Sequence, residues 1–135
     1  MDELTFLEER DEALFVAYKT ALRQPDCKSH QQAIDMAINS PTSQFWICPY
    51  RAYREILWRK NGRRPSRMSS GRRNLVDDLF AAYQKLERQP MFRGCSTFFI
   101  SQFAASSVAP RGFYLSKRSA IRIINRKRAE RGGVR

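Results

Sequence analysis

Two stretches of this chain, LFVAYKTALRQP (residues 14–25) and LFAAYQKLERQP (residues 79–90), are identical at seven of their twelve positions. A second correspondence follows in the same order, because FWICPYRAYREI (residues 45–56) matches FYLSKRSAIRII (residues 113–124) at four identical positions. The offset between matching residues is 65 in the first block and 68 in the second. Two matches in one order predict a tandem duplication within a chain of 135 residues.

Each predicted repeat is mainly α-helical and follows one plan: helix A, helix B, a short extended aromatic piece and helix C. Helix A has apolar residues at helical spacing and ends at a Gln-Pro pair, because the residue before proline avoids helical dihedral angles. Helix B is expected at about 29–38 and 97–106, with Ser29 matched to Thr97. The extended piece is FWI in one repeat and FYL in the other, and a basic helix C follows it.

Capping residues support these helix boundaries. Ser29, with Gln32 three residues later, resembles a capping box, and Ser116 is a favourable N-cap for the second helix C. Pro49 suits the first position of a helix. Gly62 and the glycine pair at 132–133 lie where C-terminal caps belong.

The repeats define the expected domain organisation. A first repeat at 1–62 contains an acidic N-terminal helix, and a second, strongly basic repeat occupies 73–131. The segment 63–72 between them is rich in Gly, Pro, Ser and Arg, which is typical of a linker. Residues 132–135 are expected to form a flexible tail.

Charge is distributed unevenly along the chain, whose net charge is +12. Residues 1–50 hold 4 basic and 8 acidic residues, whereas residues 51–135 hold 21 basic and 5 acidic ones. Such asymmetry indicates a polyanionic partner, most commonly nucleic acid, although an acidic protein or an anionic membrane would meet the same electrostatic requirement.

The sequence predicts a cytoplasmic protein that does not enter a membrane. No apolar run approaches the roughly 18–20 residues that a membrane helix needs. The start of the chain, MDELTFLEERDE, is acidic, whereas a signal peptide is basic and then apolar. Association with the nucleoid would follow if the partner is DNA.

Helix C of each repeat is the predicted nucleic-acid-binding element. In the second repeat Arg118, Arg122 and Arg126 recur every four residues and therefore share one helix face. A basic helix is a common means of reaching the DNA major groove, so duplex DNA is favoured over RNA. The other basic residues expected to contribute are Arg51, Arg54, Arg59, Arg63, Arg64, Arg67 and Lys117.

Three further expectations accompany this site. Few carboxylates appear near the arginines in sequence, so few salt bridges are expected there. The acidic N-terminal helix is expected to face away from the polyanion, and the second repeat to dominate affinity. The acidic pairs Glu8-Glu9, Asp11-Glu12 and Asp77-Asp78 are interpreted as residues at helix starts that favour the helix dipole.

The aromatic pieces have an inner and an outer residue. Adjacent residues of an extended segment face opposite ways, so Phe45 and Phe113 are expected in the core. Trp46 and Tyr114 are expected to be partly exposed, where they would stack on bases. The matched Tyr18 and Tyr83 are expected in the core.

No catalytic, cofactor or metal site is predicted. His30 is the one histidine, which excludes a multi-histidine metal site, and no glycine-rich phosphate loop is present. Cys27, Cys48 and Cys95 form no CxxC pair and are expected to be free, small buried hydrophobes.

Other interpretations of the same pattern remain open. The basic face of helix C is also compatible with an ordinary solvated helix face. Roughly ten residues separate helix B from helix C, unlike the 3–4-residue turn of a helix-turn-helix motif. The rival class is a protein-interaction or structural component, associated with a phage or a ribosome, that docks its basic half on an acidic or RNA-containing partner. A third possibility is self-masking of the basic half by the acidic half.

The block SVAPRGFYLS (residues 107–116), followed by Ala120 and Arg122, resembles one in short uncharacterised proteins of Bacteroides-group gut bacteria and their mobile elements. The form in that family runs PRFYVS, and here Gly112 is inserted before the aromatic pair. In the first repeat Ser43-Gln44 replaces Pro-Arg. The resemblance covers about 30 residues of each repeat and implies no function.

Overall fold

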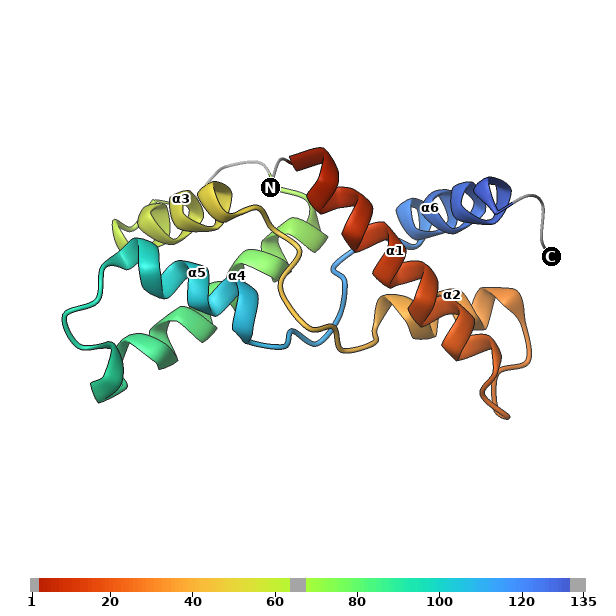
Figure 1. Ribbon diagram of the computed structural model, residues 1–135, viewed down its shortest axis with the longest axis horizontal. Helices are drawn as coiled ribbons and strands as arrows, with labels where there is room; N and C mark the ends of the chain where they lie inside the picture. Colours follow the sequence, from red (N-terminus) through yellow and green to blue (C-terminus); the bar gives the residue numbers. More distant parts are fainter. Residues whose placement is uncertain (1–2, 64–67, 132–135) are drawn as a thin grey trace. The chain divides into compact units, whose positions relative to one another are not determined.

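The computed structural model describes residues 3–63 and 68–131 and is mainly α-helical, as predicted, with no strand in those ranges (Figure 1). The α-helices are α1 (Glu3–Leu22), α2 (His30–Ile38), α3 (Pro49–Lys60), α4 (Ser70–Glu87), α5 (Thr97–Ser107) and α6 (Lys117–Glu130). A short 3₁₀-helix, η1 (Pro90–Phe92), follows α4.

The helices form two compact units that do not coincide with the predicted repeats. Unit 1 comprises residues 1–42 and 111–135, and in it α1, α2 and α6 contact one another. Unit 2 comprises residues 43–110, and in it α3, α4 and α5 contact one another. Helix C of each predicted repeat therefore packs with helices A and B of the other repeat, so the predicted boundaries 1–62 and 73–131 describe sequence segments rather than packing units.

Matched contacts hold helix C in each unit. In unit 2 the Phe45 amide donates to the Ala105 carbonyl at 2.8 Å, and in unit 1 the Phe113 amide donates to the Ile38 carbonyl at 2.9 Å. Each bond joins the aromatic piece before helix C to the end of a helix B. The aromatic piece is therefore anchored in the same way in both units. In each unit this piece comes from one predicted repeat, and the helix B that it contacts comes from the other.

An equivalent ion pair joins helix C to helix A in each unit. Arg59 of α3 lies 2.6 Å from Asp77 of α4, and Lys127 of α6 lies 3.5 Å from Glu12 of α1. These residues correspond at the two sequence offsets of 68 and 65.

The structure corrects the predicted register of helix B by one residue. The N-caps are Ser29 and Ser96, whose hydroxyl oxygens accept from the amides of Gln32 and Phe99. Ser29 therefore matches Ser96 rather than Thr97, at an offset of 67. The extra residue that raises the offset to 68 at helix C is in the following loop, where the sequence has Gly112 as an insertion.

Most helix ends lie where capping chemistry predicts. The Ser116 hydroxyl caps α6, Pro49 opens α3, and Gly62 ends α3 with a φ of +76°, which favours glycine. The predicted linker is too long at its end, because the Ser69 hydroxyl caps α4 and residues 70–72 are helical. The glycine pair and tail at 132–135 lie outside the described residues.

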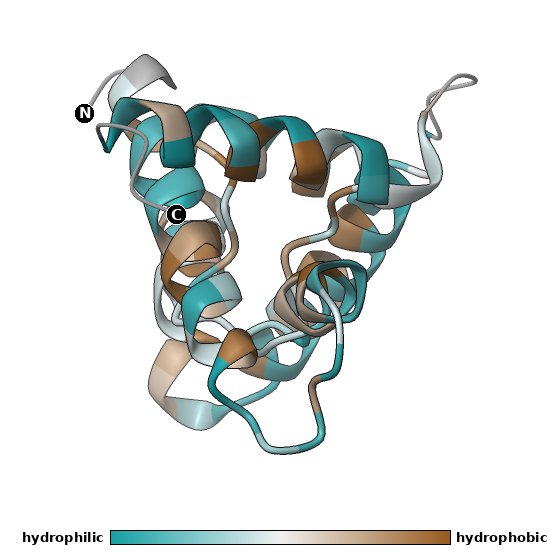
Figure 2. Cartoon of the chain, turned by 90° about the vertical axis from the view of Figure 1, so that its right-hand side faces the viewer, coloured by the Kyte–Doolittle hydropathy of each residue, from teal (hydrophilic) through white to brown (hydrophobic). Residues whose placement is uncertain are grey.

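Each unit has its own apolar core, and the predicted burial of Tyr18, Phe45, Tyr83 and Phe113 is confirmed. Phe45 and Tyr83 are buried in unit 2, while Tyr18 and Phe113 are buried in unit 1. Other core residues are Leu14, Ile34 and Ile124 in unit 1 and Ile56, Val76 and Leu79 in unit 2. The helices carry both hydrophilic and hydrophobic bands, as amphipathic helices do (Figure 2).

Two local expectations are wrong. The FYL piece is not extended throughout, because Tyr114 adopts a left-handed φ of +58°, a conformation that costs a side chain such as tyrosine roughly 1–2 kcal/mol. The cysteines are free, but none is fully buried, since Cys27 and Cys48 are half-buried and Cys95 is exposed.

Candidate nucleic-acid interface

The acidic pairs of the sequence lie well inside helices rather than at their starts. α1 begins at Glu3, so Glu8 to Glu12 follow its first turn, and α4 begins at Ser70, seven residues before Asp77. The helix dipole acts within the first turn, so the interpretation of these pairs as dipole partners is wrong. Several of the carboxylates are instead partners of basic side chains.

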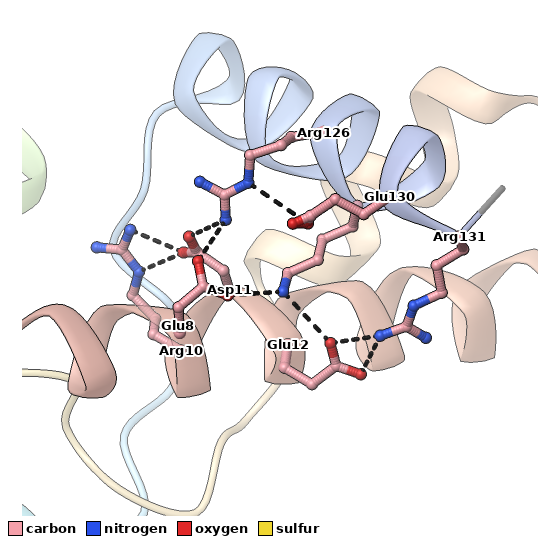
Figure 3. A network of polar contacts seen from close by, with 8 residues as sticks. Glu8, Arg10, Asp11, Glu12, Arg126, Glu130 and Arg131 are labelled. Atoms are coloured by element: carbon pink, nitrogen blue, oxygen red, sulfur yellow. Dashed lines mark hydrogen bonds and ion pairs between the residues drawn. The ribbon is translucent and has the colours of Figure 1, made fainter. Parts of the chain in front are cut away.

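A network of ion pairs joins α1 to α6 in unit 1 (Figure 3). The Arg126 Nη2 donates to Asp11 Oδ2 at 2.7 Å and to Glu8 Oε1 at 3.2 Å. The buried Lys127 donates to Glu8 Oε2 at 3.0 Å. Arg131 donates to both oxygens of Glu12. The basic face of α6 is thus partly neutralised by α1.

The protonation equilibria reflect these contacts. The hydrogen bond to Asp11 raises the pKa of Arg126, and the hydrogen bond to Glu8 raises the pKa of Lys127. The hydrogen bond from Arg131 lowers the pKa of Glu12. Each shift favours the charged form that the network requires.

One sequence expectation fails here. Carboxylates do accompany the basic side chains of α6, because residues more than 110 positions away in sequence lie beside them. The acidic α1 packs against α6, and the orientation of α1 away from a polyanion stays a prediction. By sequence, unit 1 holds 13 basic and 9 acidic residues, net +4, whereas unit 2 holds 12 basic and 4 acidic, net +8. The larger positive charge therefore belongs to unit 2.

The remaining predicted residues of α6 differ in availability. Lys117 pairs with Asp35 of α2 at 3.3 Å. Arg118 and Arg122 are exposed. Arg122 also lines a cleft of about 640 Å³ together with Arg10 of α1 and Ser119. The same cleft contains Glu8, Asp11 and Arg126, so its charge is mixed.

Unit 2 contains a more basic cleft, of about 340 Å³, which we name the arginine cleft. Three arginines converge on it: Arg51 and Arg54 from α3, and Arg72 from the first turn of α4. Glu55 also lines it but is buried, with 6% of its surface exposed. The other lining residues are Trp58, Met68 and Ser69.

Arg54 is held in this cleft by aromatic rings. Its guanidinium carbon lies 5.0 Å from the centroid of Trp58 and 6.0 Å from that of Tyr50, which are cation–π distances. Its Nε is buried and has no hydrogen-bond partner among the described residues. The same holds for Arg59 Nε, so the missing acceptor is a cost within the fold and does not by itself mark a ligand position.

The basic end of α3 has a structural role instead. Arg59 pairs with Asp77 at 2.6 Å. The Lys60 ammonium donates to the Tyr83 hydroxyl at 3.0 Å and to Glu87 at 3.1 Å. The hydrogen bond from the Lys60 ammonium to the Tyr83 hydroxyl raises the pKa of Lys60. The hydrogen bond from the Tyr83 hydroxyl to Glu87 lowers the pKa of Glu87. These contacts tie α3 to α4, so Arg59 is a poor candidate for binding a ligand.

The other predicted site residues are dispersed. Trp46 and Tyr114 are half-buried, as expected, but belong to different units. Arg63 is exposed just after α3. Arg64 and Arg67 lie outside the described residues.

Sequence reasoning misses parts of the arginine cleft. The composition of segment 63–72 places Arg72 in a linker, and no motif points to Trp58 or Ser69. One signal is available for Arg72: Ser69 is an N-cap type of residue, and Leu75, Leu79 and Leu86 follow at helical spacing, so the helix start is readable in the sequence.

No family model, curated protein or solved structure matches this chain. Within residues 3–63 and 68–131, no group of three or more His, Cys, Asp or Glu side chains could hold a metal ion. In those same ranges, no helix has the length and apolarity needed to cross a membrane.

Proposed function

We propose that this chain is a non-enzymatic nucleic-acid-binding protein that acts on duplex DNA in the cytoplasm, and that the arginine cleft of unit 2 supplies its main contacts. The observation that carries the proposal is the convergence of Arg51, Arg54 and Arg72 on one cleft. Arginine suits this role because its planar guanidinium binds phosphate oxygens through two parallel hydrogen bonds.

The surroundings of the cleft favour an anion. The first turn of α4, capped by Ser69, borders it, and a helix N-terminus presents amide donors and a partial positive charge. Unit 2 carries a net +8 within 68 residues, which provides long-range attraction to a polyanion.

Unit 1 would contribute a weaker, second contact. Arg122 corresponds to Arg54 at an offset of 68, and Arg118 is exposed beside it on α6. Two related helices on one chain suit a duplex with pseudo-palindromic half-sites. The sequence favours the second repeat as the main source of DNA affinity. Because α1 neutralises part of α6, we propose instead that α3 makes the larger contribution to DNA affinity.

The proposal includes the tandem duplication. The matched hydrogen bonds of Phe45 and Phe113 and the matched ion pairs Arg59–Asp77 and Lys127–Glu12 support it. This pattern would arise if two copies of an ancestral three-helix unit exchanged their helices C and were then fused into one chain.

Fluorescence anisotropy of the full chain with a labelled 20-base-pair duplex, across a salt series, tests the function. On duplex DNA the slope of log affinity against log salt decreases by about 0.9 for each phosphate that the protein no longer binds. Arg51→Ala/Arg54→Ala should lower the slope by about two such steps. The control Lys85→Ala/Arg88→Ala removes the same charge from exposed positions outside the cleft and should change the slope by less than one step.

An equal effect of the two double variants would mean that affinity follows net charge alone, and the proposed interface would be wrong. No binding beyond that of an unrelated protein of the same charge would favour the rival class, in which the basic half docks on an acidic or RNA-containing partner.

A further inference from the structure

α5 exposes a group of apolar side chains that unit 2 does not need in order to hold α5 in place. Phe98, Phe99 and Phe103 are 47%, 51% and 37% exposed, and Met91 of the preceding 3₁₀-helix η1 is 74% exposed. We name these four residues the aromatic face. The opposite side of α5 is the buried one, where Ile100, Ala104 and Ala105 enter the core. A helix that is apolar on both sides is normally covered on both sides.

The rings of this face are ordered by contacts within unit 2. Phe92 is buried, and its ring centroid lies 5.0 Å from that of Phe103 and 6.4 Å from that of Phe99. Phe98 meets Tyr53 of α3 edge-on at 5.2 Å. Side chains held in this way lose little conformational freedom on binding, which favours affinity.

The matched helix of unit 1 shows that the fold works without this face. In the register set by the N-caps Ser29 and Ser96, Gln31 and Gln32 of α2 occupy the positions of Phe98 and Phe99. Both glutamines are exposed. The aromatic residues are therefore a property of one unit rather than a need of the helical scaffold.

We propose that the aromatic face docks another protein, through a helical segment of that partner that is apolar at its centre and acidic at its edges. Exposed apolar patches mark interaction sites, and phenylalanine, tyrosine and methionine are enriched at the centres of protein interfaces. The acidic edge follows from charge complementarity, since the exposed Arg88 and Arg93 flank Met91 in sequence.

Composition disfavours nucleic acid as the occupant. A surface that stacks the bases of a single strand combines its aromatic rings with a basic groove that follows the phosphates. Arg88 and Arg93 lie only near the Met91 end of the face in sequence, whereas residues 94–110, which include all of α5 and its three exposed phenylalanines, contain no charged residue. The aromatic face is thus distinct from the arginine cleft, and the chain would join a protein to whatever the cleft binds.

Selection of 16-residue peptides from a random display library on the immobilised full chain, with counter-selection on Phe98→Gln/Phe99→Gln, tests the proposal. These substitutions copy the residues of α2, so the helix should be retained, as circular dichroism would verify. Enriched peptides should carry apolar residues at i, i+3 or i+4 and i+7, with Asp or Glu at the edges. Their affinity should fall at least about tenfold on the double variant and stay within about twofold on Arg51→Ala/Arg54→Ala.

Three outcomes would overturn the proposal. Peptides that bind wild type and Phe98→Gln/Phe99→Gln equally would show that the face is not the docking site. Self-association in sedimentation velocity that the variant abolishes would identify a second copy of the chain as the occupant. Loss of single-stranded DNA affinity in the variant would assign the face to nucleic acid. If the double variant does not fold, Met91→Ser at the most exposed position of the face replaces it, with the same expectations.

Discussion

The substitution Asp11→Asn is predicted to lower the stability of unit 1 by more than the removal of one exposed charge would. The Asp11 side chain is 5% exposed and accepts from Arg126 at 2.7 Å and from Arg10 at 2.9 and 3.0 Å. Asp11→Asn preserves the shape of the side chain but replaces one acceptor oxygen by an amide donor. Both arginines then lose the Asp11 carboxylate, while Arg126 keeps its contact with Glu8 at 3.2 Å.

The magnitude follows from the burial of the partners. A hydrogen bond to a charged group contributes about 1.5–3 kcal/mol. Arg126 and Arg10 are 46% and 21% exposed, so water replaces part of what each loses. We expect a net loss of about 2 kcal/mol. For a unit of this size each kcal/mol lowers Tm by about 4–8 °C, so the unit 1 transition should move by on the order of 10 °C.

Two spectroscopic probes separate the units. Both tryptophans, Trp46 and Trp58, belong to unit 2, so tryptophan fluorescence follows that unit, whereas far-UV circular dichroism follows both. Asp11→Asn should shift the circular dichroism transition, while the tryptophan transition moves less. Glu9→Gln, an exposed change of equal charge on the same helix, should cost less than about 0.5 kcal/mol. Equal midpoints for Asp11→Asn and wild type would refute the assignment of the network to stability.

Four other predictions address the remaining features. Glu8→Gln/Glu12→Gln should raise duplex DNA affinity, measured by anisotropy, because it frees cations of α6 from α1. Gly112→Ala should lower Tm, because a Cβ there would lie 2.8 Å from the carbonyl oxygen of the last residue of α2. A fragment of residues 1–62 should unfold without cooperativity in urea, since it lacks α6, the third helix of unit 1. Acid titration followed by circular dichroism should show a loss of stability that begins near pH 4.5. The pKa of Glu12 in the folded protein lies below its ordinary value of 4.5. The contribution of Glu12 to stability is therefore present above pH 4.5 and disappears as the pH falls through the lowered pKa.

These predictions have distinct controls and failures. For the Glu8 and Glu12 change, Glu9→Gln/Asp26→Asn gives the same charge difference at exposed positions, and an equal gain of affinity would argue against masking by α1. Gly112→Ala with an unchanged Tm would mean that the loop accommodates the methyl group. A cooperative transition in the 1–62 fragment would contradict the exchange of helix C. In the acid titration, an unchanged midpoint for Glu12→Gln would show that Glu12 does not contribute to stability.

The positions of the helices are predictable because their signals are local. Serine caps, the Gln-Pro pairs and Gly62 act within a few residues of a helix end, and the structure confirms most of them. The match of Ser29 to Thr97 is wrong by one residue, because Ser96 and Thr97 are adjacent and both are N-cap types of residue.

The grouping of the helices is not predictable, because the two halves of the sequence are similar. Helices A and B of both predicted repeats present similar apolar positions, so helix C fits either pair by pattern alone. The arrangement depends on contacts such as the Phe113–Ile38 hydrogen bond, which span more than 70 residues. Periodicity within one element carries no information about such partners.

Only part of the candidate site is predictable from the sequence, because the rest depends on contacts between different helices. The basic character of helix C is visible in sequence, and Arg51 and Arg54 remain proposed contacts. The ion pairs that occupy Arg59 and Arg126 are not visible, because Asp77 and Asp11 come from other helices. The same dependence on tertiary contacts hides Arg72 as a member of the cleft.

The most direct test of the central claim is a titration of the ¹⁵N-labelled full chain with an unlabelled 12-base-pair duplex at physiological salt, followed through arginine Nε–H and backbone amide resonances. Nucleic-acid binding by the arginine cleft predicts early, saturable shifts of the Arg54 Nε–H and of the Ser69 and Arg72 amides, because these three residues line the cleft. Shifts confined to α6 or to the aromatic face, or the absence of any saturable shift, would contradict it.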